Sequence, residues 1–129
     1  MDACRRARKT GPVVRTVLIV DDDPSYREAA RMVLTARGLR VIAEADGAVQ
    51  CLALARQMRP DAVLLDVYLA DGDGVAVAKR LSATSGCRVV LTSSDRDAVP
   101  DRLVRSSGAV GFVPKENLAG VALKLYLAG

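Results

Sequence analysis

The sequence predicts an α/β fold: a doubly wound, five-stranded parallel sheet with five helices. From residue 17 onward, short runs rich in Val, Ile and Leu alternate with segments of helical periodicity. These runs are continuously apolar, which is typical of parallel strands buried on both faces. Because crossovers between such strands are right-handed, we expect helices on both sides of the sheet. A chain of 129 residues is long enough for one such domain.

The first two strand and helix pairs carry clear start and stop signals. The first strand is predicted over 17–20 and ends in three consecutive aspartates. Pro24 then opens a helix that runs to Gly38, because proline suits a first helical turn and glycine a helix end. The second strand covers 40–45, and its helix follows directly and stops before Pro60.

The third and fourth pairs follow the same order. The third strand, 62–65, ends on Asp66, and a loop rich in Asp and Gly leads to a helix around 75–81. The fourth strand, 88–91, is followed by a polar loop and a helix of roughly 98–107. The sequence therefore repeats one structural step along most of its length.

The fifth strand, 110–113, leads through Pro114 to a last helix from about Leu118. The apolar residues of this helix form two stripes at 100° per residue. We expect the sheet to bury the first stripe, which contains Leu118, Val121, Ala122 and Leu125. The second stripe, Leu123 and Leu127, is expected to face outward and to provide a homodimer surface.

The net charge of +4 comes from the beginning of the chain. The sequence has 19 Lys and Arg against 15 Asp and Glu. Residues 1–16 hold five basic residues and one acid, and five minus one accounts for the whole excess. We expect residues 1–15 to be a flexible basic tail and residues 16–129 to form the domain. DNA binding by this chain would rest on the tail alone.

Composition excludes several functional classes. The absence of histidine excludes catalysis by a Ser-His-Asp or Cys-His arrangement and zinc sites that contain histidine. Three cysteines without C-x-x-C spacing predict neither a disulfide framework nor a thiolate metal site, and they indicate a cytoplasmic setting. No apolar stretch is long enough to span a membrane, so no membrane partner is expected.

Polar residues stand at the carboxyl ends of the predicted strands: Asp21 and Asp22, Asp66, Thr92, and Lys115. In a parallel sheet these ends meet at one edge, where ligands bind. Three carboxylates repel one another unless a cation compensates, and a set of oxygen ligands suits Mg²⁺. Since Mg²⁺ commonly binds phosphate oxygens, the sequence predicts phosphoryl chemistry, with Asp66 as the best candidate nucleophile.

Four motifs, VLIVDDDP, DAVLLDVYLADGDG, VVLTSS and GAVGFVPK, resemble in order and spacing the receiver domain of two-component response regulators. The segment GFVPK is closest in pattern to receivers of the NarL or FixJ type. The resemblance covers residues 17–127 and implies a flavodoxin-like strand order, 2-1-3-4-5. It also implies a signalling switch rather than an enzyme, with intrinsic autophosphorylation and autodephosphorylation.

The resemblance assigns the acceptor and the metal ligands residue by residue. It implies that Asp66 accepts a phosphoryl group from a partner histidine kinase or phosphotransfer protein. Asp21 and Asp22 would be the acidic Mg²⁺ pair. Asp66 itself and the backbone carbonyl of Tyr68 would complete the metal sphere.

The resemblance also assigns the switch. Thr92 would turn toward the phosphoryl group, Lys115 would form an ion pair with it, and Phe112 would be the rotating aromatic residue. The surface that changes would consist of the fourth helix, the fifth strand and the last helix. That surface would control an output or dimerisation.

Alternatives remain beside this interpretation. The chain could be a receiver-shaped interaction module that works without phosphorylation, or the N-terminal fragment of a transcriptional regulator whose DNA contacts lie in an output domain outside these residues. Residues 71–75 resemble the nucleophile motif of haloacid-dehalogenase-type phosphatases, but that motif should follow a buried strand directly, and here the strand ends at Asp66. We expect Asp23, Asp71 and Asp73 to be solvated loop acids.

Overall fold

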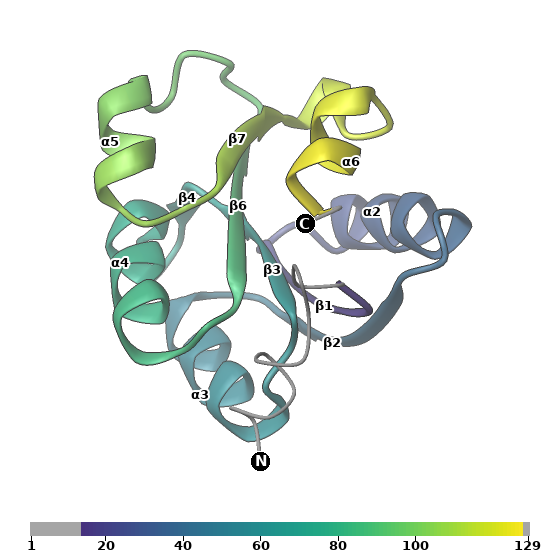
Figure 1. The fold of residues 1–129 in the computed structure, drawn as a ribbon, viewed down its shortest axis with the longest axis horizontal. Coiled ribbons are helices and arrows are strands. Elements are labelled where there is room, and N and C mark those ends of the chain that lie inside the picture. Colours follow the sequence, from purple (N-terminus) through teal and green to yellow (C-terminus); the bar gives the residue numbers. More distant parts are fainter. Residues whose placement is uncertain (1–13, 128–129) are drawn as a thin grey trace.

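A computed structural model describes residues 14–127, in which strands and helices alternate (Figure 1). Five strands form the main sheet: β1 (Thr16–Val20), β2 (Arg40–Ala45), β3 (Ala62–Asp66), β6 (Arg88–Ser93) and β7 (Gly111–Pro114). The helices of these residues are α2 (Pro24–Ala36), α3 (Ala48–Met58), α4 (Gly74–Thr84), α5 (Asp101–Ser106) and α6 (Val121–Leu127), with a 3-10 turn η1 (Lys115–Asn117). The predicted alternation of strands and helices is confirmed.

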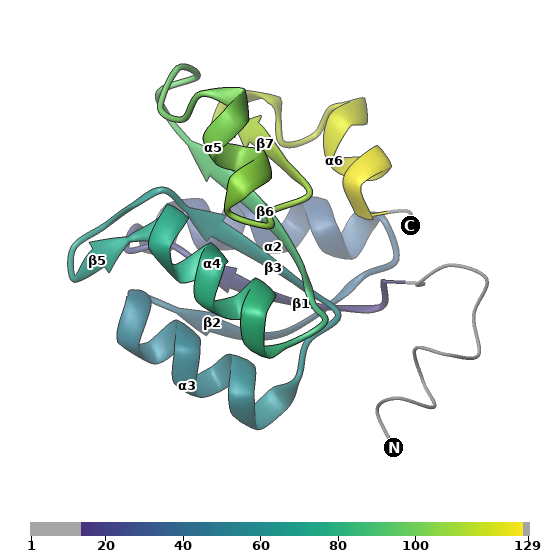
Figure 2. The ribbon, with the colours of Figure 1, turned by 60° about the vertical axis from the view of Figure 1, so that its left-hand side comes forward.

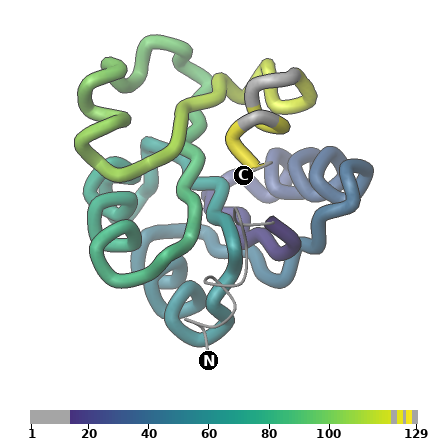
Figure 3. Tube along the Cα trace, in the orientation of Figure 1, coloured from purple at the N-terminus to yellow at the C-terminus, as the bar shows by residue number. Residues whose placement is uncertain are grey.

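The sheet is parallel throughout, and its strand order is β2-β1-β3-β6-β7. Counted along the chain, this is the expected order 2-1-3-4-5. Helices α3, α4 and α5 cover one face of the sheet, and α2 and α6 cover the other (Figures 1 and 2). The backbone trace crosses from one face to the other between α2 and α3 and returns after β7 (Figure 3). The doubly wound prediction is therefore confirmed.

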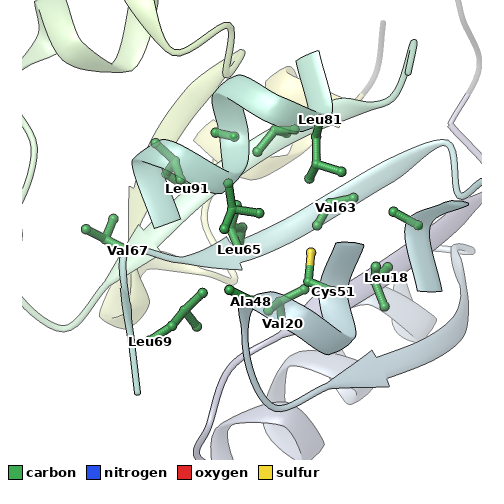
Figure 4. Close-up of a cluster of buried hydrophobic side chains, with 14 of the residues drawn as sticks. Leu18, Val20, Ala48, Cys51, Val63, Leu65, Val67, Leu69, Leu81 and Leu91 are labelled. Atoms are coloured by element: carbon green, nitrogen blue, oxygen red, sulfur yellow. The ribbon is translucent and has the colours of Figure 1, made fainter. Parts of the chain in front are cut away.

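The core lies on both faces of the sheet because each central strand contains a continuous run of apolar residues. In β1, Leu18 and Val20 face the α3, α4 and α5 side, while Val17 and Ile19 face α2 and α6. Figure 4 shows the first of these clusters, in which Leu65 of β3 lies near Leu91 of β6. The four residues of β1 named here are at most 1% exposed. Burial on both faces explains the continuous apolar runs.

Two local elements differ from the sequence predictions. Helix α5 begins at Asp101 and not near residue 98, since Pro100 disfavours helical backbone at the residue that precedes it. The segment between β3 and α4 was predicted as a loop, but it contains an antiparallel pair of short strands, β4 (Tyr68–Leu69) and β5 (Gly72–Asp73). The first residue of this pair, Tyr68, comes two residues after Asp66, the last residue of β3.

The orientation of the last helix corrects the prediction made for its second stripe. Leu123 is fully buried and Leu127 is 7% exposed, and both belong to the cluster formed with α2. The helix begins at Val121, after the 3-10 turn, rather than near Leu118. A helix that is apolar on nearly all sides does not reveal which stripe faces the sheet, and docking against α2 decides it. The expected homodimer surface formed by Leu123 and Leu127 is therefore wrong.

Val14 and Arg15 belong to the folded domain, although both were expected in the tail. Val14 is 8% exposed within the core. The Arg15 N–H donates to Oδ2 of Asp61 at 2.9 Å, and the Arg15 carbonyl accepts from Arg40 N–H. The rest of the expected tail, residues 1–13, lies outside the described residues.

Cys51 and Cys87 both carry free thiols. In the part of the chain that the structure describes, no helix has the length and apolar character needed to cross a bilayer.

Candidate functional site

The carboxyl ends of the strands bring the predicted residues together at one edge of the sheet. Asp21 follows β1, Asp66 is the last residue of β3, and Lys115 follows β7. Thr92 lies inside β6, one residue before its end, and is paired in register with Asp66. The parallel topology thus gathers side chains that are far apart in the sequence.

Three carboxylates form a compact acidic cluster. Asp21, Asp22 and Asp66 each offer an oxygen, and these oxygens lie within 4.8 Å of one another. Asp21 is fully buried and Asp66 is 5% exposed, whereas Asp22 is exposed. The Asp23 N–H donates to Oδ1 of Asp21 at 2.9 Å and orients that carboxylate. Such a cluster of hard oxygen ligands, open to solvent on one side, has the chemistry that Mg²⁺ prefers.

Lys115 is the cation of the cluster. Its Nζ lies 2.7 Å from Oδ2 of Asp21 and 3.3 Å from Oδ2 of Asp66. Burial alone would lower the pKa of Lys115, but the two carboxylates outweigh burial and raise it. The ammonium group is therefore held in its charged form.

The pKa of Asp66 is raised, whereas an ion pair ordinarily lowers the pKa of an aspartate. Burial, and then the neighbouring charge of Asp21, raise the pKa of Asp66. Lys115 and the Tyr68 N–H, which donates to Oδ1 of Asp66 at 3.2 Å, only partly oppose this. Three carboxylates also face one ammonium group, so the cluster has more negative charge than Lys115 alone compensates.

The remaining predicted residues surround Asp66. Thr92 is fully buried, and its carbonyl accepts from Val67 N–H at 2.9 Å. The Tyr68 side chain is 59% exposed on β4. Phe112 is half-buried on β7, beside Leu91, and packs against the cluster formed with α3, α4 and α5.

Sequence reasoning missed two residues of the site, Tyr26 and Arg27. The Tyr26 ring centroid lies 4.4 Å from Nζ of Lys115. Arg27 Nη1 donates to the Asp21 carbonyl at 2.7 Å, while its Nε donates to Glu44 of β2 at 2.9 Å. Their position offered a usable signal, because a helix that starts directly after a strand-end acid places its first residues beside that acid.

The other loop acids are exposed, as expected, and they stabilise helix starts. Asp23 accepts from Ser25 N–H at the start of α2, and Asp73 accepts from Val75 N–H at the start of α4. Asp71 accepts from Ala48 N–H at 2.6 Å and so connects the loop after β4 to α3. Across the site, Arg96 of the loop after β6 forms an ion pair with Glu116, next to Lys115.

Comparisons with known proteins show which family this chain resembles. A family model described as the response regulator receiver domain matches residues 17–124. The DNA-binding response regulator MtrA of Mycolicibacterium smegmatis is 39% identical over 114 residues, which is 84% of this chain and 50% of MtrA. The chain thus spans about half the length of the curated relatives that it matches.

Solved structures show the same fold. A two-component response regulator of the LuxR family from an Aurantimonas species has 27% identity and a TM-score of 0.81, over 90% of this chain and 86% of that one. The signal receiver domain of the response regulator NarL from Mycobacterium tuberculosis has 28% identity and a TM-score of 0.76, over 89% of this chain and 98% of that one.

Proposed function

The chain belongs to the response regulator receiver domain family, a signalling domain of two-component systems, and we propose that it accepts a phosphoryl group on Asp66. The observation that carries this proposal is the environment of Asp66. Its carboxylate lies at the end of a central strand, 3.3 Å from Lys115 Nζ and within 4.8 Å of the oxygens of two further aspartates.

The acidic cluster supports a bound divalent cation. Asp21, Asp22 and Asp66, with the backbone carbonyl of Tyr68, would hold Mg²⁺. The donor set consists of hard oxygens, and a cation would offset both the burial and the Asp21 charge that raise the pKa of Asp66. When bound, Mg²⁺ supplies positive charge to the oxygens of the transferring phosphoryl group.

Several residues of the chain would have separate roles in the phosphoryl transfer. A carboxylate oxygen of Asp66 attacks phosphorus, and the bond from phosphorus to the imidazole nitrogen of a partner phosphohistidine breaks as the acyl phosphate forms. The partner would be a histidine kinase or a phosphotransfer protein, since this chain has no histidine of its own. Lys115 and the Thr92 hydroxyl would then contact the phosphoryl oxygens, and attack by water would return Asp66 to its free form.

The new charge would bias a two-state element of the fold. Thr92 and Phe112 lie on neighbouring strands, with Thr92 paired to Val113, the residue after Phe112. Movement of Thr92 toward the phosphoryl group would therefore displace the side chain of Phe112 and change the surface formed by α5, β7 and α6. The relative MtrA is a DNA-binding response regulator of which this chain covers half, and this supports an output role for the surface.

Intact-mass spectrometry tests the proposal directly. Incubation with acetyl phosphate and Mg²⁺ should add about 80 Da, one phosphoryl group, to the wild-type chain. Asp66→Ala should remove the adduct, whereas Asp97→Ala, which changes an exposed aspartate of the loop after β6, should leave it unchanged. An undiminished adduct in Asp66→Ala would overturn the assignment. A folded wild-type chain without any adduct would favour the phosphorylation-independent interaction module.

A further inference from the structure

Two buried hydroxyl groups from different elements make no hydrogen bond of normal geometry. They are the phenol of Tyr26, on α2, and Oγ1 of Thr92, on β6. A buried hydroxyl without a partner is costly, because it has lost its bonds to water and gained nothing in return. Each of these groups therefore requires a partner within its own surroundings.

The surroundings of Tyr26 contain the other hydroxyl. Burial raises the pKa of the Tyr26 phenol most strongly, and the Thr92 hydroxyl is the largest influence in the opposite direction. The Tyr26 ring also lies 4.4 Å from the ammonium of Lys115, which contacts Oδ2 of Asp66. Thr92 is paired in register with Asp66, so Tyr26 lies beside the cation of the candidate site and in the same part of the site as the Thr92 hydroxyl.

We propose that the Tyr26 hydroxyl holds the Thr92 hydroxyl while Asp66 is unphosphorylated, and that Tyr26 is a positioning residue that opposes the switch. This inference rests on the proposed function. Each hydroxyl can donate and accept, so the two can satisfy each other after a small rotation. When Asp66 carries a phosphoryl group, the Thr92 hydroxyl donates to a phosphoryl oxygen and leaves Tyr26 unpaired.

The direction in which Tyr26→Phe changes the affinity for a phosphoryl mimic depends on which state contains an unpaired hydroxyl. With Tyr26 present, the phosphorylated state contains a buried phenol that has lost its partner. Tyr26→Phe removes this penalty and, in the unphosphorylated state, leaves Thr92 without its partner. Both changes favour the phosphorylated state, so Tyr26→Phe should strengthen binding of a phosphoryl mimic. The ring that covers Lys115 is retained in this variant, which isolates the hydroxyl.

Beryllofluoride binding in the presence of Mg²⁺, measured by calorimetry on the whole chain, tests the inference. Tyr26→Phe should bind roughly fivefold more tightly than wild type, as expected for one hydrogen bond of ordinary strength. In a Thr92→Val background the same substitution should change the affinity by less than about twofold, because the hydroxyl on which Tyr26 acts is gone. Tyr126→Phe, which alters a half-buried tyrosine on α6, should leave the affinity unchanged.

The outcomes separate this inference from the proposed function. The role of Tyr26 is overturned, and the proposed function is not, if beryllofluoride binding requires Asp66 but Tyr26→Phe does not change the affinity. The same conclusion holds if Tyr26→Phe changes the affinity equally in the wild-type and Thr92→Val backgrounds. Binding that is absent from wild type, or that persists in Asp66→Asn, overturns both. Thermal melts of the four proteins of the cycle establish that each is folded, so a shift in affinity reports the switch.

Discussion

Gly74 packs directly against the carbonyl oxygen of Asp66. A β-carbon at residue 74 would overlap that oxygen and lie 2.7 Å from Cα of Val67. The Gly74 N–H also donates to the Val67 carbonyl at 2.7 Å, so the start of α4 is tied to the backbone of the candidate acceptor. The position of Asp66 depends on the absence of a side chain at residue 74.

Gly74→Ala is therefore expected to damage the site as well as the fold. Because the neighbouring atoms are backbone and cannot rotate away, we expect a loss of about 1–3 kcal/mol in the free energy of unfolding. The adduct from acetyl phosphate should fall even where the protein remains folded. Gly38→Ala is the control, since its β-carbon meets nothing within 4 Å and its cost comes from a φ of +84°. It should lower stability without lowering phosphorylation of the folded protein.

Removal of the Asp66 charge should stabilise the metal-free domain. Burial and Asp21 raise the pKa of Asp66 above its ordinary value of 3.8, so the folded state holds its proton more tightly than the unfolded chain. The resulting penalty is present above the raised pKa and disappears as the pH falls below the ordinary one. Asp66→Asn should gain on the order of 1 kcal/mol at pH 7 in EDTA, measured by urea unfolding, and nothing at pH 3. A loss of stability at pH 7 would contradict the balance of charges described for the cluster.

Magnesium should stabilise the wild-type chain through the acidic cluster. At about tenfold above its dissociation constant, a ligand specific to the folded state contributes about 1.4 kcal/mol. The melting temperature should rise accordingly, by a few degrees for a domain of this size. Asp22→Asn should abolish the rise, while Glu28→Gln, an exposed charge change on α2, should preserve it. An equal rise in both variants would place the ion elsewhere.

Leu123 should behave as a core residue. It is fully buried between α6 and α2, so Leu123→Ala should lower the free energy of unfolding by about 2–5 kcal/mol. Met32→Ala, at a side chain that is 68% exposed on α2, should change it by less than about 0.5 kcal/mol. Denaturant titration measures both values. A neutral Leu123→Ala would show that α6 does not dock as described.

Asp71 should stabilise the start of α3 in a pH-dependent way. The N–H groups of Ala48 and Val49 donate to its two oxygens and lower the pKa of its carboxyl group. The contribution is present above the ordinary pKa of 3.8 and is lost as the pH falls through the lowered one. Asp71→Ala should therefore melt at a lower temperature than wild type at pH 6, and the difference should narrow at pH 3. A difference that does not change with pH would mean that the carboxylate charge plays no part.

Much of the site could be predicted because it depends on topology rather than on packing detail. Continuous apolar runs require strands buried on both faces, and parallel strands place all their carboxyl ends at one edge. Asp21, Asp66, Thr92 and Lys115 follow from this rule. The start of α2 directly after the strand-end acids indicates that some of its first residues lie near the site. That Tyr26 is the one beside Lys115 depends on how α2 packs against the sheet.

The fold class and the meeting of acids and a lysine at one edge follow from the order of residues along the chain, and the strand order follows from the family resemblance. Three features become visible once the chain is folded: Leu123 faces the core, Gly74 touches the Asp66 backbone, and the Tyr26 ring lies beside Lys115. Periodicity reports which residues share a helix face, but the choice of buried face depends on surfaces contributed by distant parts of the chain. The alternation of strands and helices is a pattern repeated along the chain, so it can be recognised from the sequence. A single side-chain contact leaves no such pattern, because it arises only when distant segments pack together.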